Sequence, residues 1–583
     1  MRTNTRVHFG LYDVTARADS APACAAAQRW ADVEADLKAE QTPALPKYGT
    51  LESHQFLMDG SFTLFPDEPA GQFWGLWSTQ QSDTKGHFAV PPVLNIGFTQ
   101  PHSSTGFTLH FYPPTDDWAS ELTIQWFTAN SELLATGVFR PDAVDYYCAR
   151  KVENYSRVSI TFAATNRSGR YLKLTGIDYG VNLTFEGQEV VKANVLEEVD
   201  LLSNEVRINT LGLTLHNKDG LFSILNQDGV FSVLQHKQKF TVFEDVRADA
   251  RAEKLTYNMG SFYLSEWRNE SDTLAEFTAT DAVGLLDGAD HMGGVYDTTA
   301  AELAAEILEG YDYELAPELS AMAVRGWLPI GTRRSALQQL AFAIGVVVDC
   351  SRGDKIRLYP PPTRPSSHIG ANRKWLGSKV ELKPLVTGVV VTAHQYLPGS
   401  QVEELFKDTL LPGLHQVSFS APASDLSCTG GVISAWGHNY ANVQVAEEGE
   451  VVITGRKFVE TTTTVRAAAE NLPANAQANL LRVDNATLVG PGNAVSVAQR
   501  VIGYYAKRCA QEFKMLAGEE LLADTVILDT FGGERLKGGL ERMEFDLTGG
   551  YVASAKLVGA RLANASADQA RAGEIYTGER SMI

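Results

Sequence analysis

The sequence lacks any apolar run long enough to cross a membrane as a helix. A spanning helix needs about 20 consecutive, predominantly apolar residues, and no segment of the 583 residues approaches that pattern. The first residues, MRTNTRVHFGLYDVTARADS, also lack the apolar stretch and cleavage site of a signal peptide. We therefore expect neither a helical membrane anchor nor secretion through a signal peptide.

Positive charge is scarce relative to negative charge. The chain has 50 Lys and Arg against 70 Asp and Glu, a formal net charge of −20. Because a protein binds a phosphate backbone through a basic face, this balance argues against direct binding of nucleic acid. An acidic chain is still compatible with a conduit through which DNA slides without sticking.

Cysteines are few, and the motifs of common catalytic sites are missing. The five cysteines are scattered and form no CxxC pair, as expected for free thiols in a reducing cytoplasm. Neither HExxH nor GxSxG occurs, and the Gly-rich run at 532–539 lacks the Lys-Ser/Thr pair of a phosphate-binding loop. Neighbouring carboxylates such as Asp116-Asp117 point in different directions, so we expect solvated faces rather than a glycosidase pair. The sequence predicts no catalytic residues, no metal and no cofactor.

What the chain does contain is a succession of short β-strand patterns. Between 181 and 286, Val206, Ile208, Leu211, Leu213 and Leu215 recur at near-alternate positions, which is the period of half-buried strands. Further strands of the same kind follow, separated by turn-forming residues. This segment is predicted to close into a small antiparallel barrel.

The length requires several domains, and changes of pattern divide the chain. A strand over 5–14 and an Ala-rich helix over 23–40 open it. Short aromatic strands with regular turns follow up to Gly180, which is typical of a sandwich or jelly roll. Further predicted elements are helices at 298–311, 332–345 and 493–516, a Pro-rich linker at 360–370, and β-rich text from 376 to 467. The predicted divisions are 1–50, 51–180, 181–286, 287–365, 366–470, 471–561 and a loose tail over 562–583.

The segment before Gly180 is rich in aromatic residues, which stack on the apolar faces of sugar rings when they are exposed. The candidate glycan-binding residues are Trp74, Trp77, Trp118 and Tyr147. The alternative is that most of these rings are core residues. Trp126, between Ile124 and Phe127 in a strand, is predicted to be packed.

Several of these stretches resemble known proteins. The order EEVDLLSNEVRINTLGLTLHN, GLFS, GSFYL and FTATDAVGLLD resembles the first barrel of phage tail hub proteins. ALQQLAFAIG and the later FDLTGG text resemble the following hub domains. LMDGS at 57–61, Trp77-Ser78, GFTLHF at 106–111 and IDYG at 177–180 resemble the discoidin-like, galactose-binding-like modules of phage tail proteins.

The resemblance implies a mainly β fold with α+β parts: a jelly-roll module at 51–180, hub barrels at 181–286 and 366–470, and hub domains at 287–365 and 471–561. Residues 1–50 are expected to dock on the hub. A homotrimer at the virion tail tip, assembled in the bacterial cytoplasm, would adapt the sixfold tube to a threefold tip. Its implied partners are a distal tail or tail tube protein, a tape-measure protein, a tail fibre or tip protein and a host glycan, with DNA passing through the lumen.

Two other functions remain open at this point. The chain can be a receptor-binding adhesin that acts through the jelly-roll module. It can also be a carbohydrate-active enzyme with a binding module. Turnover of a polysaccharide would select the enzyme, and affinity without turnover would select the adhesin.

Overall fold

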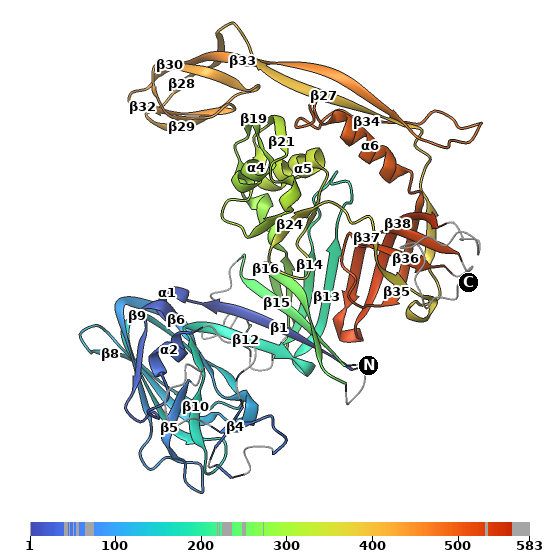
Figure 1. The fold of residues 1–583 in the computed structure, drawn as a ribbon. Helices are drawn as coiled ribbons and strands as arrows, with labels where there is room; N and C mark the ends of the chain where they lie inside the picture. Colours follow the sequence, from blue (N-terminus) through green and yellow to red (C-terminus); the bar gives the residue numbers. More distant parts are fainter. Residues whose placement is uncertain are drawn as a thin grey trace.

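A computed structural model describes most of the chain, and it is mainly β, as predicted. Figure 1 shows a module at one side, a central body with a large sheet, and a long arm over the top. The residues that the structure describes are 2–39, 45, 47–50, 52–53, 58–64, 75–217, 220, 222–223, 236–247, 252–271, 273–530 and 534–562. The predicted tail after Leu562 lies outside them.

One 13-stranded sheet forms the framework of the molecule. Its order is β12 (Gly180–Glu186), β1 (Arg2–Tyr12), β15 (Lys239–Arg247), β16 (Leu255–Ser271), β17 (Leu274–Thr280), β14 (Thr210–His216), β13 (Val190–Glu198), β37 (Arg535–Asp546), β38 (Val552–Leu562), β35 (Cys509–Leu516) and β26 (Lys379–Leu382). Off this path, β36 (Thr525–Asp529) pairs with β37, and β25 (Pro365–Ile369) pairs with β36. β13 and β37 meet in antiparallel register, with Val195 opposite Phe545. One apolar core therefore runs through strands from both ends of the chain.

The strands of 366–470 are arranged differently from the second small barrel expected there. β25 and β26 join the large sheet, while β27 (Gly388–Pro398) and β33 (Gly449–Ala468) pair over their lengths as a two-stranded arm (Figure 1). β34 (Leu480–Val483) pairs with the base of the arm. Residues 461–464 of β33 are exposed on both faces, so this part of the hairpin has no buried side on which a barrel could close.

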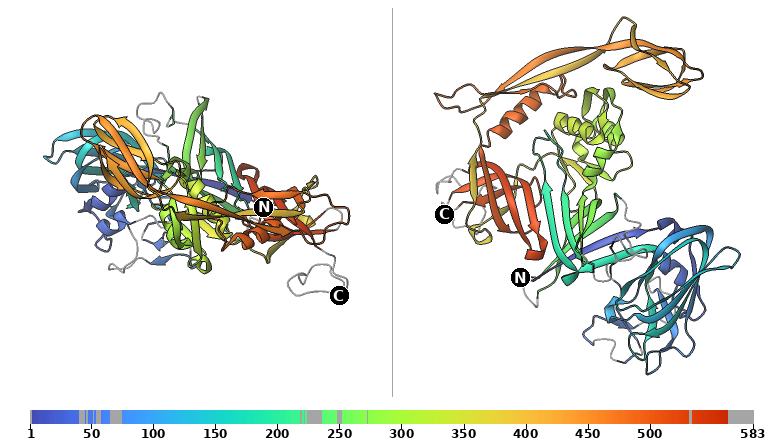
Figure 2. Two further views of the ribbon diagram at one scale, coloured as in Figure 1. Left: turned by 90° about the horizontal axis from the view of Figure 1, so that it is seen from above. Right: turned by 180° about the vertical axis from the view of Figure 1, so that it is seen from behind.

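The arm ends in a small distal lobe. Its strands are β28 (Glu403–Leu410), β29 (Gly413–Ser418), β30 (Ala423–Thr429), β31 (Val432–Trp436) and β32 (Tyr440–Val445). The buried amide of Asn439 donates to the carbonyls of Met292 and Leu328 at 2.9 and 2.8 Å, and accepts from the Trp327 indole at 2.8 Å. The lobe is thereby fastened to the central body, and both views in Figure 2 show the arm lying along it.

Between sheet and arm lies the helical part of the central body. Helices α4 (Ala300–Ile307) and α5 (Arg333–Ile344) confirm two predictions, including the Thr299–Glu302 capping box and the left-handed Gly345 at the end of α5. The short elements around them are α3 (Ala282–Leu285), β18 (Asp290–His291), β19 (Gly294–Thr299), β20 (Tyr313–Leu315), β21 (Ala323–Leu328), β22 (Gly331–Thr332), β23 (Val347–Asp349) and β24 (Ile356–Tyr359).

The helix predicted over 493–516 is wrong in its second half. Helix α6 spans Ala494–Tyr505, and the rest becomes strand β35. In β35 the buried Phe513 and Met515 alternate with exposed Glu512 and Lys514, which is the period of a strand. Asn493 does precede the helix, but its side chain does not cap it; it accepts from Gly490 N–H at 2.8 Å instead.

The N-terminal strand belongs to the large sheet, where β1 pairs with β12 and β15. Tyr12 at the end of β1 lies opposite Gly180 at the start of β12. The chain between them, residues 13–179, therefore leaves the large sheet and re-enters it at the same end of the β1–β12 pair. The module at 13–179 contains α1 (Val14–Asp19), β2 (Ala21–Cys24), α2 (Val33–Lys38), β3 (Tyr48–Gly49), β4 (Thr63–Leu64), β5 (Leu76–Gln81), β6 (Val93–His110), β7 (Ala119–Phe127), β8 (Leu133–Phe139), β9 (Asp145–Thr165), β10 (Tyr171–Leu174) and β11 (Gly176–Asp178).

The expected long helix at 23–40 is reduced to the six residues of α2, which begins after the Asp32 cap. β2 pairs with β6, and Val33 and Leu37 of α2 pack in the module core. Residues 13–39 therefore lie with the module, and of residues 2–39 only β1 reaches the large sheet. The expected division at 50/51 does not match this packing, because short local patterns carry no information about which core a segment joins.

Candidate functional site

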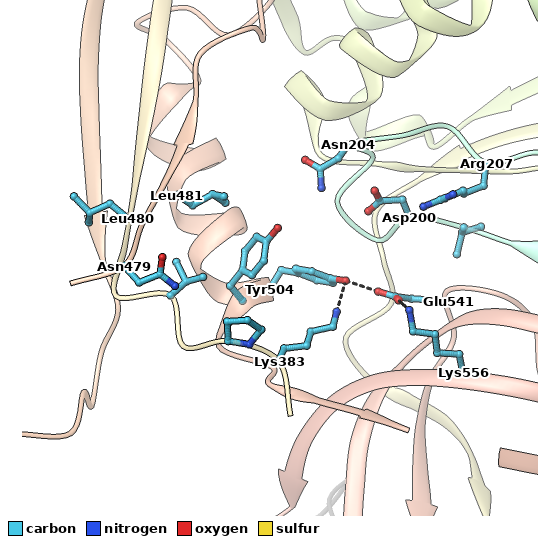
Figure 3. Close-up of a pocket in the computed structure, with 14 residues that line it drawn as sticks. Asp200, Asn204, Arg207, Lys383, Asn479, Leu480, Leu481, Tyr504, Glu541 and Lys556 are labelled. Carbon is cyan, nitrogen blue, oxygen red and sulfur yellow. Dashed lines mark hydrogen bonds and ion pairs between the residues drawn. The ribbon is translucent and has the colours of Figure 1, made fainter. Parts of the chain in front are cut away.

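A cavity of about 470 Å³ lies where the C-terminal sheet, helix α6 and the base of the arm meet. Figure 3 shows its side chains converging from these segments and from the loop between β13 and β14. Its lining residues are Val199, Asp200, Asn204, Arg207, Lys383, Pro384, Val386, Asn479, Leu480, Leu481, Tyr504, Tyr505, Glu541 and Lys556. We call this cavity the joint pocket.

Local structure explains how two of its residues reach the cavity. Helix α6 buries Val497, Ala498 and Val501 on one face, and its last turn carries Tyr504 to the pocket. The register of β37 and β38 shifts between Leu540 and Arg542, which places Glu541 in a bulge. A bulge re-aims the side chain of its extra residue, and here the carboxylate faces the tyrosine.

Hydrogen bonds connect the segments across the pocket. The Tyr504 hydroxyl donates to Glu541 Oε1 and accepts from Lys383 Nζ at 3.0 Å. Lys556 Nζ lies 3.5 Å from Glu541 Oε2. Lys383 Nζ also lies 4.8 Å from the centre of the Tyr504 ring. One hydroxyl thus connects α6, the segment after β26 and the C-terminal sheet.

Burial sets the protonation of these groups. It lowers the pKa of the Lys383 ammonium. Burial is the largest cause that raises the pKa of the Tyr504 hydroxyl and of Asp200, and the charge of Glu541 also raises both. Tyr504 therefore keeps its proton and acts as a donor to the Glu541 carboxylate.

The side chains of the joint pocket are arranged as structural contacts between segments, and not as a catalytic site. The tyrosine hydroxyl donates to the Glu541 carboxylate and accepts from the Lys383 ammonium, and no nucleophile in the pocket is aligned with a base. Within the described residues, no three His, Cys, Asp or Glu side chains are grouped to hold a metal ion. No helix among them is both long and apolar enough to cross a bilayer.

Of the four residues predicted to bind glycan, the three that the structure describes do not form one exposed platform. Trp77 is 1% exposed, Tyr147 is 9% exposed and Trp118 is half-buried against the module core. The Tyr147 hydroxyl donates to the Thr105 carbonyl at 2.8 Å. Trp74 lies outside the described residues. Glycan binding by these residues stays a prediction. Among the three described candidates, Trp118 has the most accessible ring. Trp126 is fully buried, as predicted.

The surroundings of Trp77 explain its burial. Its ring packs edge-on against Trp30, Tyr48 and Tyr112. The Nζ atom of Lys173, which is also buried, lies 5.1 Å from the centre of the Trp77 ring. The same ammonium pairs with Glu52 at 2.8 Å and with Asp117 at 2.5 Å. The Lys173 ammonium therefore lies against the buried aromatic cluster to which Trp77 belongs.

Arg333 and Arg334, the pair at the start of α5, interact within the chain. Arg334 Nε donates to Asp287 at 2.7 Å, and Arg333 donates to the Glu309 carbonyl at 2.5 Å. The joint pocket had no signal in the sequence, because Lys383, Tyr504 and Glu541 are distant along the chain and match no motif.

Comparison with known proteins gives structural matches only. No protein-family model matches the sequence. No curated protein matches it either. Among solved structures, the 43 kDa tail protein of prophage MuSo2 from Shewanella oneidensis aligns with a TM-score of 0.39 at 11% identity, covering 64% of this chain and 95% of that one. The prophage tail protein gp18 from Listeria monocytogenes EGD-e gives 0.37 at 8%, covering 64% and 91%. The tail protein from Neisseria meningitidis MC58 gives 0.39 at 9%, covering 64% and 93%.

Proposed function

We propose that this chain is a structural protein of a phage tail or of a phage-derived particle, placed at the distal tip as a baseplate hub. The sequence resemblance of 181–286 to hub barrels motivates the assignment. In this proposal three copies form a ring that adapts a sixfold tube to a threefold tip. The work of the protein is architectural and involves no turnover.

The observation that carries the proposal is the sheet seam between β13 and β37. It joins strands from the two ends of the chain into one framework with a shared core. The module, the arm and the helical part all project from this framework (Figure 1). A single framework with projecting parts suits a component that contacts several neighbours at once.

Charge and the joint pocket support the same function. A net charge of −20 suits a channel wall past which tape-measure protein and DNA move without sticking. In the joint pocket, the hydrogen bonds of Tyr504 to Glu541 and Lys383 hold the base of the arm against the C-terminal sheet. Such a connection is useful in a structural component that must keep its shape. The partners in this proposal are a distal tail or tail tube protein above the ring and a tail fibre or tip protein below it.

The proposal is tested on the particle itself. Particles reconstructed by electron microscopy should hold three copies at the tail tip, around the channel. Deleting the gene should leave tails without a closed tip. Copies along the tube or in the head, or full tails in the deletion strain, would overturn the assignment. The purified chain should release neither reducing ends nor peptides from cell-wall material.

A second candidate function, host attachment, concerns the module alone. Its motivation is Trp118, which is half-buried beside the exposed Asp116. Binding of module 13–179 to a host-surface glycan, lost in Trp118→Ala and kept in Trp126→Phe, would support it. Equal binding by the unchanged module and by both variants would show that Trp118 has no part in attachment.

A further inference from the structure

The outermost strand of the module, β8, is an uncharged strand at a sheet edge. β8 follows β7 at the end of the order β11-β6-β9-β7-β8. Its seven residues, LLATGVF, include no charged residue and no proline. Figure 1 shows the strand on the side of the module that faces away from the rest of the chain, and Figure 2 agrees. Nothing in the described chain covers its free edge.

The side chains of β8 are apolar and accessible. Leu133, Leu134 and Val138 are 55%, 42% and 62% exposed. Ala135 and Phe139 point to the other face, where they pack against the module core. Natural sheet edges are protected by charges, prolines or bulges, because a bare edge pairs with other strands. β8 itself contains none of these charges or prolines. Its pairing with β7 is irregular only at Leu134, near one end of the strand, so a paired edge accounts for its composition.

We propose that β8 pairs with β8 of a second copy, antiparallel and about a two-fold axis at Thr136. In this register Leu134 lies opposite Val138 of the second copy, and Leu133 lies opposite Phe139. Each of these contacts occurs twice, because a two-fold interface is self-complementary. Apolar residues opposite each other across strands are what stabilises such a pair.

Charges at the two ends of the strand favour this register and this occupant. Glu132 directly precedes β8 and Arg140 directly follows it, and both are exposed. About the axis at Thr136, Glu132 of one copy faces Arg140 of the other, at both ends. Arg140 is 79% exposed and lies 3.7 Å from Glu121 in its own chain, so it can serve both carboxylates. A slip by one residue in either direction would lose these ion pairs.

The pairing goes beyond the proposed ring and does not depend on it. A two-fold contact joins two separate assemblies, because three copies around a threefold axis cannot all be paired with each other in twos. A monomeric chain would therefore form dimers, and a trimeric ring would form pairs of rings through its outer modules.

The test is sedimentation of the full chain over a range of concentrations. Reversible doubling, of one copy to two or of three copies to six, is expected. Leu134→Lys with Val138→Lys places like charges opposite each other and should weaken doubling at least about tenfold. Val90→Lys is the matched control in the same module, since Val90 is 71% exposed and lies outside β8. It should leave doubling unchanged.

A charge exchange tests the register. Glu132→Arg alone and Arg140→Glu alone should each weaken doubling, and the two together should restore it. Oxidised Thr136→Cys should give covalent dimers, while Val90→Cys should not. Species of only one or three copies at every concentration would overturn the proposal. So would doubling that survives the lysine pair, which would place the contact elsewhere. The species seen at low concentration, of one copy or of three, tests the proposed ring separately from the β8 pairing.

Discussion

Glu197 Oε1 lies 2.6 Å from Arg352 Nε, and both side chains are buried, at 1% and 10% exposure. Glu197 is on β13, and Arg352 is in the turn between β23 and β24. The Arg352 guanidinium also lies 4.6 Å from the centre of the Phe545 ring on β37 and donates to the Tyr551 hydroxyl at 3.1 Å. One arginine therefore bridges the helical part of the body and both sides of the β13–β37 seam.

Arg352→Met should destabilise the protein strongly. It leaves the buried Glu197 without its cation, and breaking a buried pair from one side costs about 3–5 kcal/mol. Urea unfolding measures the loss. Arg325→Met is the matched control, because Arg325 and its partner Asp297 are 72% and 73% exposed, and such surface pairs contribute little to stability. Equal losses in the two variants would contradict a special role for Arg352.

Stability should fall as pH rises from 4.5 to about 7. Burial raises the pKa of the Glu244 carboxyl from 4.5 to about 7 in the folded chain. Between these values the folded state holds protons that the unfolded state has lost, so the stability present below pH 4.5 is lost on raising the pH. Glu244→Gln should make this pH dependence of urea unfolding shallower. An unchanged slope in the variant would mean that Glu244 is ionised in the folded chain.

The sequence predicts those features that short, local patterns determine. The ends of α4 and α5 follow from Thr299, Glu302 and Gly345, which lie within a few residues of the helices they bound. The mainly β character follows from alternation along the strands. The end of α6 is missed, because CAQEFKML reads equally well as helix until its pairing with β38 is known.

Pairing over long distances is what the sequence leaves open. The β13–β37 seam, the two-stranded arm and the assignment of 13–39 to the module all depend on which strand lies beside which. The joint pocket depends on them in turn, because Lys383, Tyr504 and Glu541 meet only once the sheet and α6 are in place. Burial of Trp77 has the same origin, since Trp30 and Lys173 come from distant segments.

Tyr504→Phe should loosen the base of the arm. The change removes the hydroxyl that connects Lys383 and Glu541, and a partly buried polar group left without its partner costs about 1–3 kcal/mol. Hydrogen exchange should speed up at β34 and around Lys383. Tyr505→Phe, at the next position and in the same pocket, is the control and should change exchange little. Faster exchange in the control alone would contradict the connection through Tyr504.

The module at 13–179 should be removable as a unit. Because Tyr12 lies opposite Gly180 in the β1–β12 pair, replacing 13–179 by Asn-Gly should close a two-residue hairpin. The shortened chain should melt cooperatively, and the isolated module should fold. Deleting only 51–180 should fail, because it leaves β2 and α2 without the core on which they pack. If the chain without 51–180 is soluble and melts cooperatively while the chain without 13–179 aggregates, the module begins near residue 51 and not at residue 13.

The number of copies in the assembled protein tests the central claim most directly. Mass photometry of the purified full chain, with the Leu134→Lys and Val138→Lys changes to remove any two-fold pairing, counts the copies in one particle. A ring-forming hub predicts particles of three chain masses, seen as closed rings by electron microscopy. Particles of a single chain mass at every concentration, in the buffer that preserves the tails, would contradict the account.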